Sequence, residues 1–120
     1  MFELCIKDHI CAAHYLRGYE GKCKQLHGHT WKIEIKIVHK ELDDMGMVAD
    51  FTVLKAKLNE FLSILDHNCL NELEYFSKNN PTTENIAKYI FLEYSKMISP
   101  FKVKSVEVWE SDNASVIYYE

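Results

Sequence analysis

Features that would indicate a membrane protein, an exported protein or a nucleic-acid binder are absent from this sequence of 120 residues. No apolar run approaches the roughly 18 residues that a membrane helix needs. The first residues do not form a basic stretch followed by an apolar one, so we expect no secretion signal. A net charge of −4 and an isoelectric point near 5.9 argue against general binding to nucleic acids or anionic membranes, although they leave room for a local basic pocket.

The cysteines are few and irregularly spaced. Cys5, Cys11, Cys23 and Cys69 form neither a CxxC pair nor a disulfide framework, which favours a reducing, cytoplasmic setting. Internal repeats, low-complexity tracts and linkers are also missing. With 48% hydrophobic and 27% charged residues, the sequence predicts one domain over residues 1–120. A chain of this length can bury a core, but only a small one, so oligomerisation would not be surprising.

Hydrophobic periodicity predicts the fold class. Alternation of apolar and polar residues predicts four strands, at residues 2–14, 27–37, 101–110 and 114–119. Helical spacing predicts a helix over residues 51–66, capped by Asp50 or Thr52, and another from Thr82 or Thr83 to about residue 98. Loops are expected at residues 15–26, 39–47 and 72–82. The order β-β-α-α-β-β predicts an α+β fold in which two helices cover one face of a four-stranded antiparallel sheet.

Three of the six histidines are expected to converge. His27 and His29 are two residues apart at the start of a strand, so their rings project from the same face. They share parity with the apolar residues of that strand, as His14 does in the first strand, whereas His9 has the opposite parity and His39 lies at the far end. Three imidazoles with a fourth position open are typical of catalytic zinc sites. The alternative is three unrelated histidines, each satisfied by its own surroundings.

Three further features carry possible chemistry. Cys23 precedes His27 by four residues, and a thiolate near a metal has a lowered pKa that suits a base or nucleophile. Alternatively, Cys23 closes a structural site with four ligands. Asp66 can orient His67 for acid–base work, although such a pair also occurs as a simple charge pair at helix ends. Glu110, at the end of the third strand, is either solvated or binds a planar, guanidine-like group through two parallel hydrogen bonds.

Together, in order and spacing, these motifs resemble those of the 6-pyruvoyl-tetrahydropterin synthase superfamily over essentially the whole chain. The matching stretches are Ala12-Ala13-His14, Cys23-x-x-x-His27-Gly28-His29, Gly-Met-Val-Ala-Asp-Phe at 46–51, Leu-Asp-His-Asn-Cys-Leu-Asn at 65–71, Pro-Thr-Thr-Glu-Asn at 81–85 and Val-Trp-Glu at 108–110. Three residues between the cysteine and His-Gly-His are similar to the bacterial and archaeal 6-carboxy-5,6,7,8-tetrahydropterin synthases of the queuosine (7-deazaguanine) pathway. The animal 6-pyruvoyl synthases typically have five. One departure from the family pattern is the stretch His-Ile-Cys at residues 9–11, which lacks the usual aromatic residue.

The resemblance implies the tunnelling fold, in which subunits join their sheets into a β-barrel with the helices outside. It implies homo-oligomers, commonly hexamers, with active sites between subunits, and it implies that Thr82 and Thr83 contact the pterin from a neighbouring subunit. The implied activity is that of a lyase. The implied substrate is 7,8-dihydroneopterin triphosphate, and the implied products are 6-carboxytetrahydropterin, acetaldehyde and triphosphate.

The resemblance also implies roles for the residues singled out above. It assigns Zn²⁺ to His14, His27 and His29. Cys23 would move protons at the side-chain carbons of the substrate, and His67, oriented by Asp66, would be the partner acid and base. Glu110 would bind the 2-amino-pyrimidinone edge of the pterin.

Three alternatives stay open from the sequence. A 6-pyruvoyl-tetrahydropterin synthase would share fold, zinc and substrate but eliminate triphosphate without breaking a carbon–carbon bond. Another member could act on dihydroneopterin or sepiapterin. A non-catalytic zinc-binding module would use Cys23 as a fourth ligand and would bind no pterin.

Overall fold

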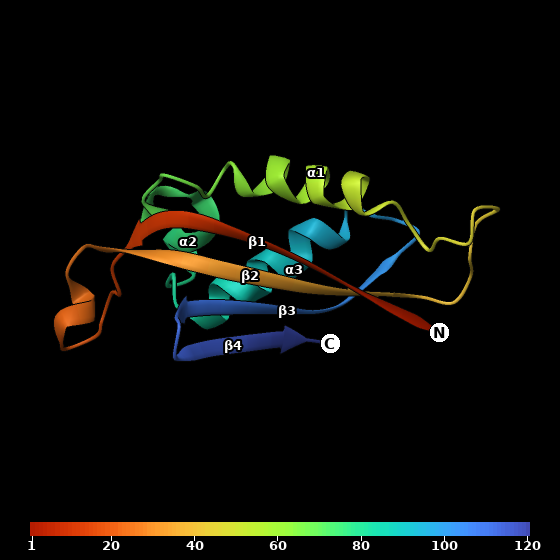
Figure 1. The fold of residues 1–120 in the computed structure, drawn as a ribbon. Coiled ribbons are helices and arrows are strands. Elements are labelled where there is room, and N and C mark those ends of the chain that lie inside the picture. The colour runs from red at the N-terminus through yellow and green to blue at the C-terminus, as the bar shows by residue number, and fades with distance from the viewer.

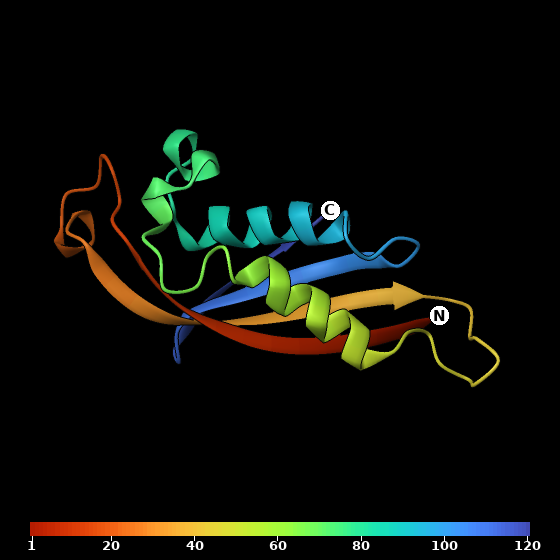
Figure 2. The ribbon, with the colours of Figure 1, turned by 90° about the horizontal axis from the view of Figure 1, so that it is seen from above.

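The four strands form one antiparallel sheet in the order β1-β2-β3-β4. This computed structural model describes the backbone of residues 1–120 and every side chain except that of Cys23. The strands are β1 (Phe2–His14), β2 (His27–His39), β3 (Lys102–Ser111) and β4 (Ala114–Tyr119). Helices α1 (Phe51–Leu62) and α3 (Thr83–Ser95) lie on one side of this sheet (Figures 1 and 2), as the periodicity predicts. Among the described residues, no helix is long and apolar enough to cross a membrane.

Helix α1 is shorter than the sequence predicts. It begins after Asp50, whose side chain accepts a hydrogen bond of 2.8 Å from the Thr52 amide. It ends at Leu62, whereas the apolar spacing predicts an end near residue 66. Leu65 continues the apolar pattern and is fully buried, but it lies in the turns that follow the helix. Burial therefore extended the periodic pattern beyond the helix itself.

The segment between α1 and α3 also differs from the prediction. The expected loop at residues 72–82 contains the short helix α2 (Glu74–Lys78), which follows the 3-10 turn η2 (Leu70–Glu72). Helix α2 is a single turn that buries Phe76, too short for periodicity to reveal. Thr82 caps α3 by accepting a hydrogen bond of 3.2 Å from the Asn85 amide. Helix α3 ends at Ser95, three residues before the predicted end.

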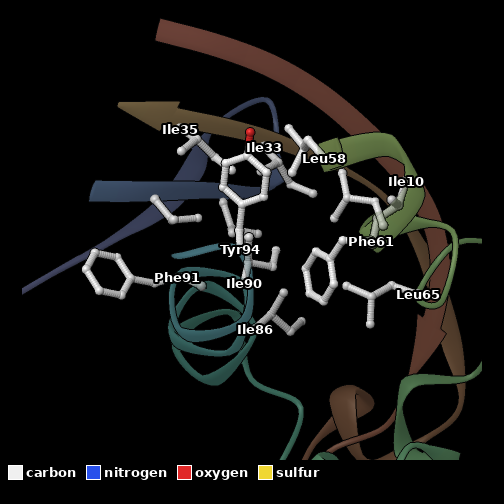
Figure 3. Close-up of a cluster of buried hydrophobic side chains, with 14 of the residues drawn as sticks. Ile10, Ile33, Ile35, Leu58, Phe61, Leu65, Ile86, Ile90, Phe91 and Tyr94 are labelled. Atoms are coloured by element: carbon white, nitrogen blue, oxygen red, sulfur yellow. The ribbon is translucent and has the colours of Figure 1, made fainter. Parts of the chain in front are cut away.

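The core lies between the sheet and helices α1 and α3 (Figure 3). Its central residues are fully or almost fully buried: Ile10, Ile33, Ile35, Leu58, Phe61, Leu65, Ile86, Ile90 and Tyr94. Each such aliphatic or aromatic side chain stabilises the fold by about 1.5–3 kcal/mol through removal from water. The hydroxyl of Tyr94 donates a hydrogen bond of 2.7 Å to the carbonyl of Leu54, so its one polar atom is satisfied. The pairing of β1 with β2 holds these two strands side by side, and they carry His14, His27 and His29.

Candidate metal centre and active site

The register of β1 and β2 brings the three predicted ligands together. His14 pairs directly with His27, and His29 pairs with Ala12. The three side chains share the core-facing side of the sheet. As a result, one ring nitrogen of each histidine lies within 4.8 Å of a ring nitrogen of each of the other two. This cluster occupies the end of the sheet where the chain leaves β1 and enters β2.

The second nitrogen of two of these rings is held by the main chain. His14 Nδ1 lies 2.7 Å from the Pro81 carbonyl oxygen, and His27 Nδ1 lies 2.7 Å from that of Gln25. A carbonyl only accepts, so each Nδ1 must donate its proton and each Nε2 keeps its lone pair. Hydrogen bonds of this kind, to the nitrogen that does not bind metal, fix the tautomer that a metal-binding histidine needs.

The remaining nitrogens face one another without adequate partners. Nε2 of His14 lies 3.0 Å from Nε2 of His27, where two lone pairs repel unless a cation or a proton lies between them. Nε2 of His29 is buried and has no hydrogen-bond partner among the described residues. Leaving a polar atom in that state costs about 1–3 kcal/mol. Three convergent imidazole nitrogens, one of them unsatisfied, fit a divalent transition metal such as Zn²⁺.

Burial prepares two of these rings for the neutral state. The pKa of His14 is lowered chiefly by its removal from water, which outweighs the opposing hydrogen bond to Pro81. The pKa of His29 is lowered for the same first reason, against the attraction of the Glu110 carboxylate. Neutral imidazole is the form that coordinates a metal, so proton competition at this site is weak at neutral pH.

Trp31 forms the floor of the cluster. Its ring is fully buried and meets those of His14 and His29 edge to face, with centroids 4.9 and 5.0 Å apart. Its indole nitrogen donates a hydrogen bond of 3.2 Å to the Ala12 carbonyl. Strand parity places Trp31 on the core face, but no pattern in the sequence indicated that it contacts two of the histidines.

Glu110 and Thr83 lie beside the cluster. One carboxylate oxygen of Glu110 is 3.6 Å from His29 Nε2, and the other accepts a hydrogen bond of 2.7 Å from the Thr83 hydroxyl. The contact between Thr83 and Glu110 is made within one chain, and the expected contact of Thr83 with a pterin stays a prediction. Thr82 precedes it as the cap of α3.

Asp66 and His67 form the predicted pair, held mainly through the main chain. The Asp66 carboxylate lies 3.0 Å from His67 Nδ1 and also accepts a hydrogen bond of 2.8 Å from the Cys11 amide. These contacts, the Cys11 amide first, lower the pKa of Asp66. His67 adopts a left-handed conformation with φ of 58°, and its amide donates to the Cys11 carbonyl. Its side chain is 79% exposed.

His67 and one of the three clustered histidines contribute to the same cavity. This cavity of about 500 Å³ is lined by His29, His67 and mostly outward-facing residues of β1 and β2, and neither His14 nor His27 lines it. The side chain of Cys23 lies outside the part of the chain that the structure describes; its main chain belongs to the 3-10 turn η1 (Lys22–Lys24), just before β2.

Known proteins share this sequence pattern. The family described as 6-pyruvoyl tetrahydropterin synthase matches residues 3–120. A protein named 6-carboxy-5,6,7,8-tetrahydropterin synthase from Bacillus subtilis (strain 168) is 41% identical over 95 residues, which cover 75% of this chain but 63% of that protein. The protein of the same name from Synechocystis sp. is 37% identical over 113 residues, covering 90% of this chain and 85% of the relative.

Solved structures share the fold. The 6-pyruvoyl tetrahydropterin synthase of Caenorhabditis elegans superposes with a TM-score of 0.87 at 26% identity, covering 99% of this chain and 95% of that one. An uncharacterized protein from Wolinella succinogenes, WS1659, superposes with a TM-score of 0.80 at 21% identity, covering 99% and 98% of the two chains. The second likeness is to the fold alone.

Proposed function

The chain belongs to the 6-pyruvoyl tetrahydropterin synthase family, and from that premise we propose that it is a zinc-dependent 6-carboxy-5,6,7,8-tetrahydropterin synthase, a lyase. The substrate would be 7,8-dihydroneopterin triphosphate, and the products would be 6-carboxytetrahydropterin, acetaldehyde and triphosphate, in queuosine or related 7-deazaguanine biosynthesis. The observation that carries the proposal is the convergence of three histidine ring nitrogens within 4.8 Å, one of them buried and unsatisfied. The names of the curated relatives favour the carboxy product over the pyruvoyl one.

In this proposal the metal is Zn²⁺, held by His14, His27 and His29. When bound, Zn²⁺ supplies Lewis acidity that makes the side-chain hydroxyls of the substrate easier to deprotonate. The protein contributes the rigidity of the site. The carbonyls of Pro81 and Gln25 keep two rings in the required tautomer, and hydrogen bonds of this kind typically raise metal affinity by about 10–100-fold.

Proton movement would belong to Cys23 and His67. The proposed reaction moves protons on and off adjacent carbons of the substrate side chain, which requires two acid–base groups. The support is that His67 is exposed and lines a cavity to which His29 also contributes. Asp66, 3.0 Å from His67 Nδ1, would hold the ring in one orientation. We propose Cys23 as the second group from its place in the family motif alone.

Pterin recognition would belong to Glu110, with Thr82 and Thr83 beside it. Thr83 donates to one oxygen of Glu110 and so fixes the plane of the carboxylate. The other oxygen, near His29, is available to accept hydrogen bonds from the 2-amino-pyrimidinone edge of the pterin. Thr82 already caps α3 through its hydroxyl, so its contact with a pterin would add to a structural role.

The assembly is also a proposal. We expect residues 1–120 to act as one domain in a cytoplasmic homo-oligomer, most simply a hexamer, in which the sheets of neighbouring subunits continue into a barrel. The support is the exposure of His67 and of the cavity that it lines, since a neighbouring subunit would enclose a site that one chain leaves open. A closed site would also strengthen the electrostatic contacts with the substrate.

Product analysis tests the proposed function. The zinc-loaded protein is incubated with 7,8-dihydroneopterin triphosphate, and the pterin product is identified by mass, with His27→Ala as the inactive control. A product with a carboxyl group at C6, together with acetaldehyde, is expected. A pyruvoyl product would instead assign the sister activity of the family. Absence of turnover while zinc is bound would favour another pterin, such as dihydroneopterin or sepiapterin, or the non-catalytic zinc-binding module.

A further inference from the structure

The outer edge of β1 is paired to side chains and loop backbone rather than to another strand. At this edge, the Cys11 amide donates to Asp66 and the Ala13 amide donates to the Asn68 carbonyl at 3.0 Å. Both partners belong to the turns that follow α1. Alternate residues of an extended chain present their main-chain groups to the same edge, so Tyr15 and Arg17 continue this row beyond the end of the strand.

Asn71 pairs with Tyr15 as a strand residue would. Its side-chain oxygen accepts a hydrogen bond of 3.0 Å from the Tyr15 amide, and its side-chain nitrogen donates one of 2.9 Å to the Tyr15 carbonyl. Asn71 is 9% exposed, so these bonds are largely shielded from water. The mechanism proposed above gives this residue no role.

Asn80 makes the same pair of hydrogen bonds with Arg17, two residues after Tyr15. Its oxygen accepts a hydrogen bond of 3.0 Å from the Arg17 amide, and its nitrogen donates one of 3.0 Å to the Arg17 carbonyl. The guanidinium of Arg17 also donates to the Phe76 carbonyl at 2.6 Å. Asn80 immediately precedes Pro81, whose carbonyl accepts from His14 Nδ1.

These contacts surround a candidate metal ligand. His14 lies between Ala13 and Tyr15, both of which are bonded at the outer edge, while its ring is bonded to Pro81. The chain then runs through residues 18–26 to the second ligand, His27, whose ring is bonded to Gln25 at the end of that segment. The segment between the two ligands is therefore fixed at both ends.

We propose that Asn71 and Asn80 are positioning residues for the metal site, acting as two amide clamps that hold the main chain directly after His14. The inference rests on the proposed metal site and assigns these side chains no contact with metal or substrate. Only a side chain with both a donor and an acceptor satisfies an amide and a carbonyl of the same residue. An aspartate is nearly the same size but cannot donate, and it would place a negative charge against the carbonyl oxygen.

The test compares Asn71→Asp and Asn80→Asp with Asn59→Asp, which makes the same change on the exposed surface of α1. Zinc affinity is measured by competition with a chromophoric chelator, the geometry of the site by the visible spectrum of the Co²⁺ form, and the clamps by amide hydrogen exchange. Asn71→Asp should bind Zn²⁺ about tenfold more weakly and change the Co²⁺ spectrum. Its carboxylate keeps the bond from the Tyr15 amide but repels the Tyr15 carbonyl, which should open the clamp and let the Tyr15 amide exchange about tenfold faster. Asn80→Asp should accelerate Arg17 exchange by a similar factor with a smaller effect on zinc. Asn59→Asp should leave all three unchanged.

The inference would be overturned if Asn71→Asp bound zinc as tightly as Asn59→Asp does, whether or not exchange at Tyr15 increases. If Asn71→Asp does not fold, the wild-type protein decides. Coupling is reciprocal, so Zn²⁺ should slow exchange at the Tyr15 amide more than at Gly46, whose amide is bonded to Asp43 in a distant turn. Equal slowing would contradict the inference. If the wild-type protein binds no Zn²⁺, the proposed function is contradicted. Faster Arg17 exchange in Asn80→Asp would then show that the clamp holds the main chain although no metal site is present.

Discussion

Two groups of residues in this molecule, the three clustered histidines and the Asp66–His67 pair, are held in opposite ways. The rings of His14, His27 and His29 project from paired strands, and two of them are fixed at Nδ1 by main-chain carbonyls. His67 lies in a left-handed turn, its main chain is bonded to β1, and its side chain is 79% exposed with Asp66 as its partner. The first group is held on paired strands and its Nε2 atoms lack adequate hydrogen-bond partners, whereas the imidazole of the second is exposed at the cavity.

This difference teaches how the chain can separate binding from proton transfer. A metal site needs ligands that do not move, and residues on paired strands provide them. An acid–base group needs access to the substrate and contact with a partner that holds its proton, and a turn anchored by its main chain provides both. Substitutions that disrupt one group while leaving the other intact should show whether metal binding and proton transfer are independent.

Removal of a ligand should have the largest effect. His27→Ala should weaken Zn²⁺ binding by on the order of a thousandfold and abolish turnover, because one of three ligands is lost. Metal content after dialysis and zinc competition measure this. The control is His9→Ala on β1, since His9 is exposed on the opposite face of the strand. Full metal occupancy in the His27 variant would refute the ligand assignment.

Removal of His67 should separate the two groups. His67→Ala should lower the rate of turnover by about 10²–10⁴-fold, the usual contribution of an acid–base residue, while metal content and affinity stay at wild-type values. Single-turnover kinetics on zinc-loaded protein give the rate, with His39→Ala at the far end of β2 as control. Loss of zinc from the His67 variant would show that the two groups are not independent.

Substitution of Glu110 should affect binding more than metal. Glu110→Gln removes the negative charge while still accepting from Thr83, so pterin affinity should fall about 10–100-fold with zinc retained, as expected for loss of a charged hydrogen bond. Calorimetric titration with a pterin measures it. Glu107→Gln on the other face of β3 should leave pterin affinity unchanged. Wild-type affinity in the Glu110 variant would remove that residue from the proposed pocket.

Mild acid, between pH 7.5 and 5.5, should destabilise the metal-free protein slightly through His14 and His29. The folded-state pKa values of His14 and His29 are lowered from 6.5 by burial, so the unfolded chain binds protons more readily. Stability is therefore fully retained above about pH 6.5 and falls as the pH drops from there through the lowered pKa values. Urea unfolding should give a smaller free energy of unfolding at pH 5.5 than at pH 7.5. His9→Ala should retain this loss, and pH-independent stability in the wild-type protein would contradict it.

The sequence predicted the elements that depend on periodicity. Strand parity selected His14, His27 and His29, and Asp50, one of the two residues predicted to cap α1, is the cap in the structure, because both features follow from local spacing. The end of α1 was wrong because Leu65 is buried without being helical.

Other features could not be predicted because they depend on contacts between distant residues or on single turns. The left-handed turn at His67 and the one-turn helix α2 leave no periodic pattern. The pairing of Asn71 with Tyr15 joins residues 56 apart, and the contact of Thr83 with Glu110 joins residues 27 apart. Such contacts appear only when the packing of the helices on the sheet is known.

The central claim is that three imidazoles, and no sulfur, hold the metal. Zinc K-edge X-ray absorption of the loaded protein measures the ligands directly. The account predicts a first shell of nitrogen and oxygen at about 2.0–2.1 Å with imidazole scattering from three rings. A zinc–sulfur distance of about 2.3 Å would contradict it, because Cys23 would then close a structural site and would not be free to move protons.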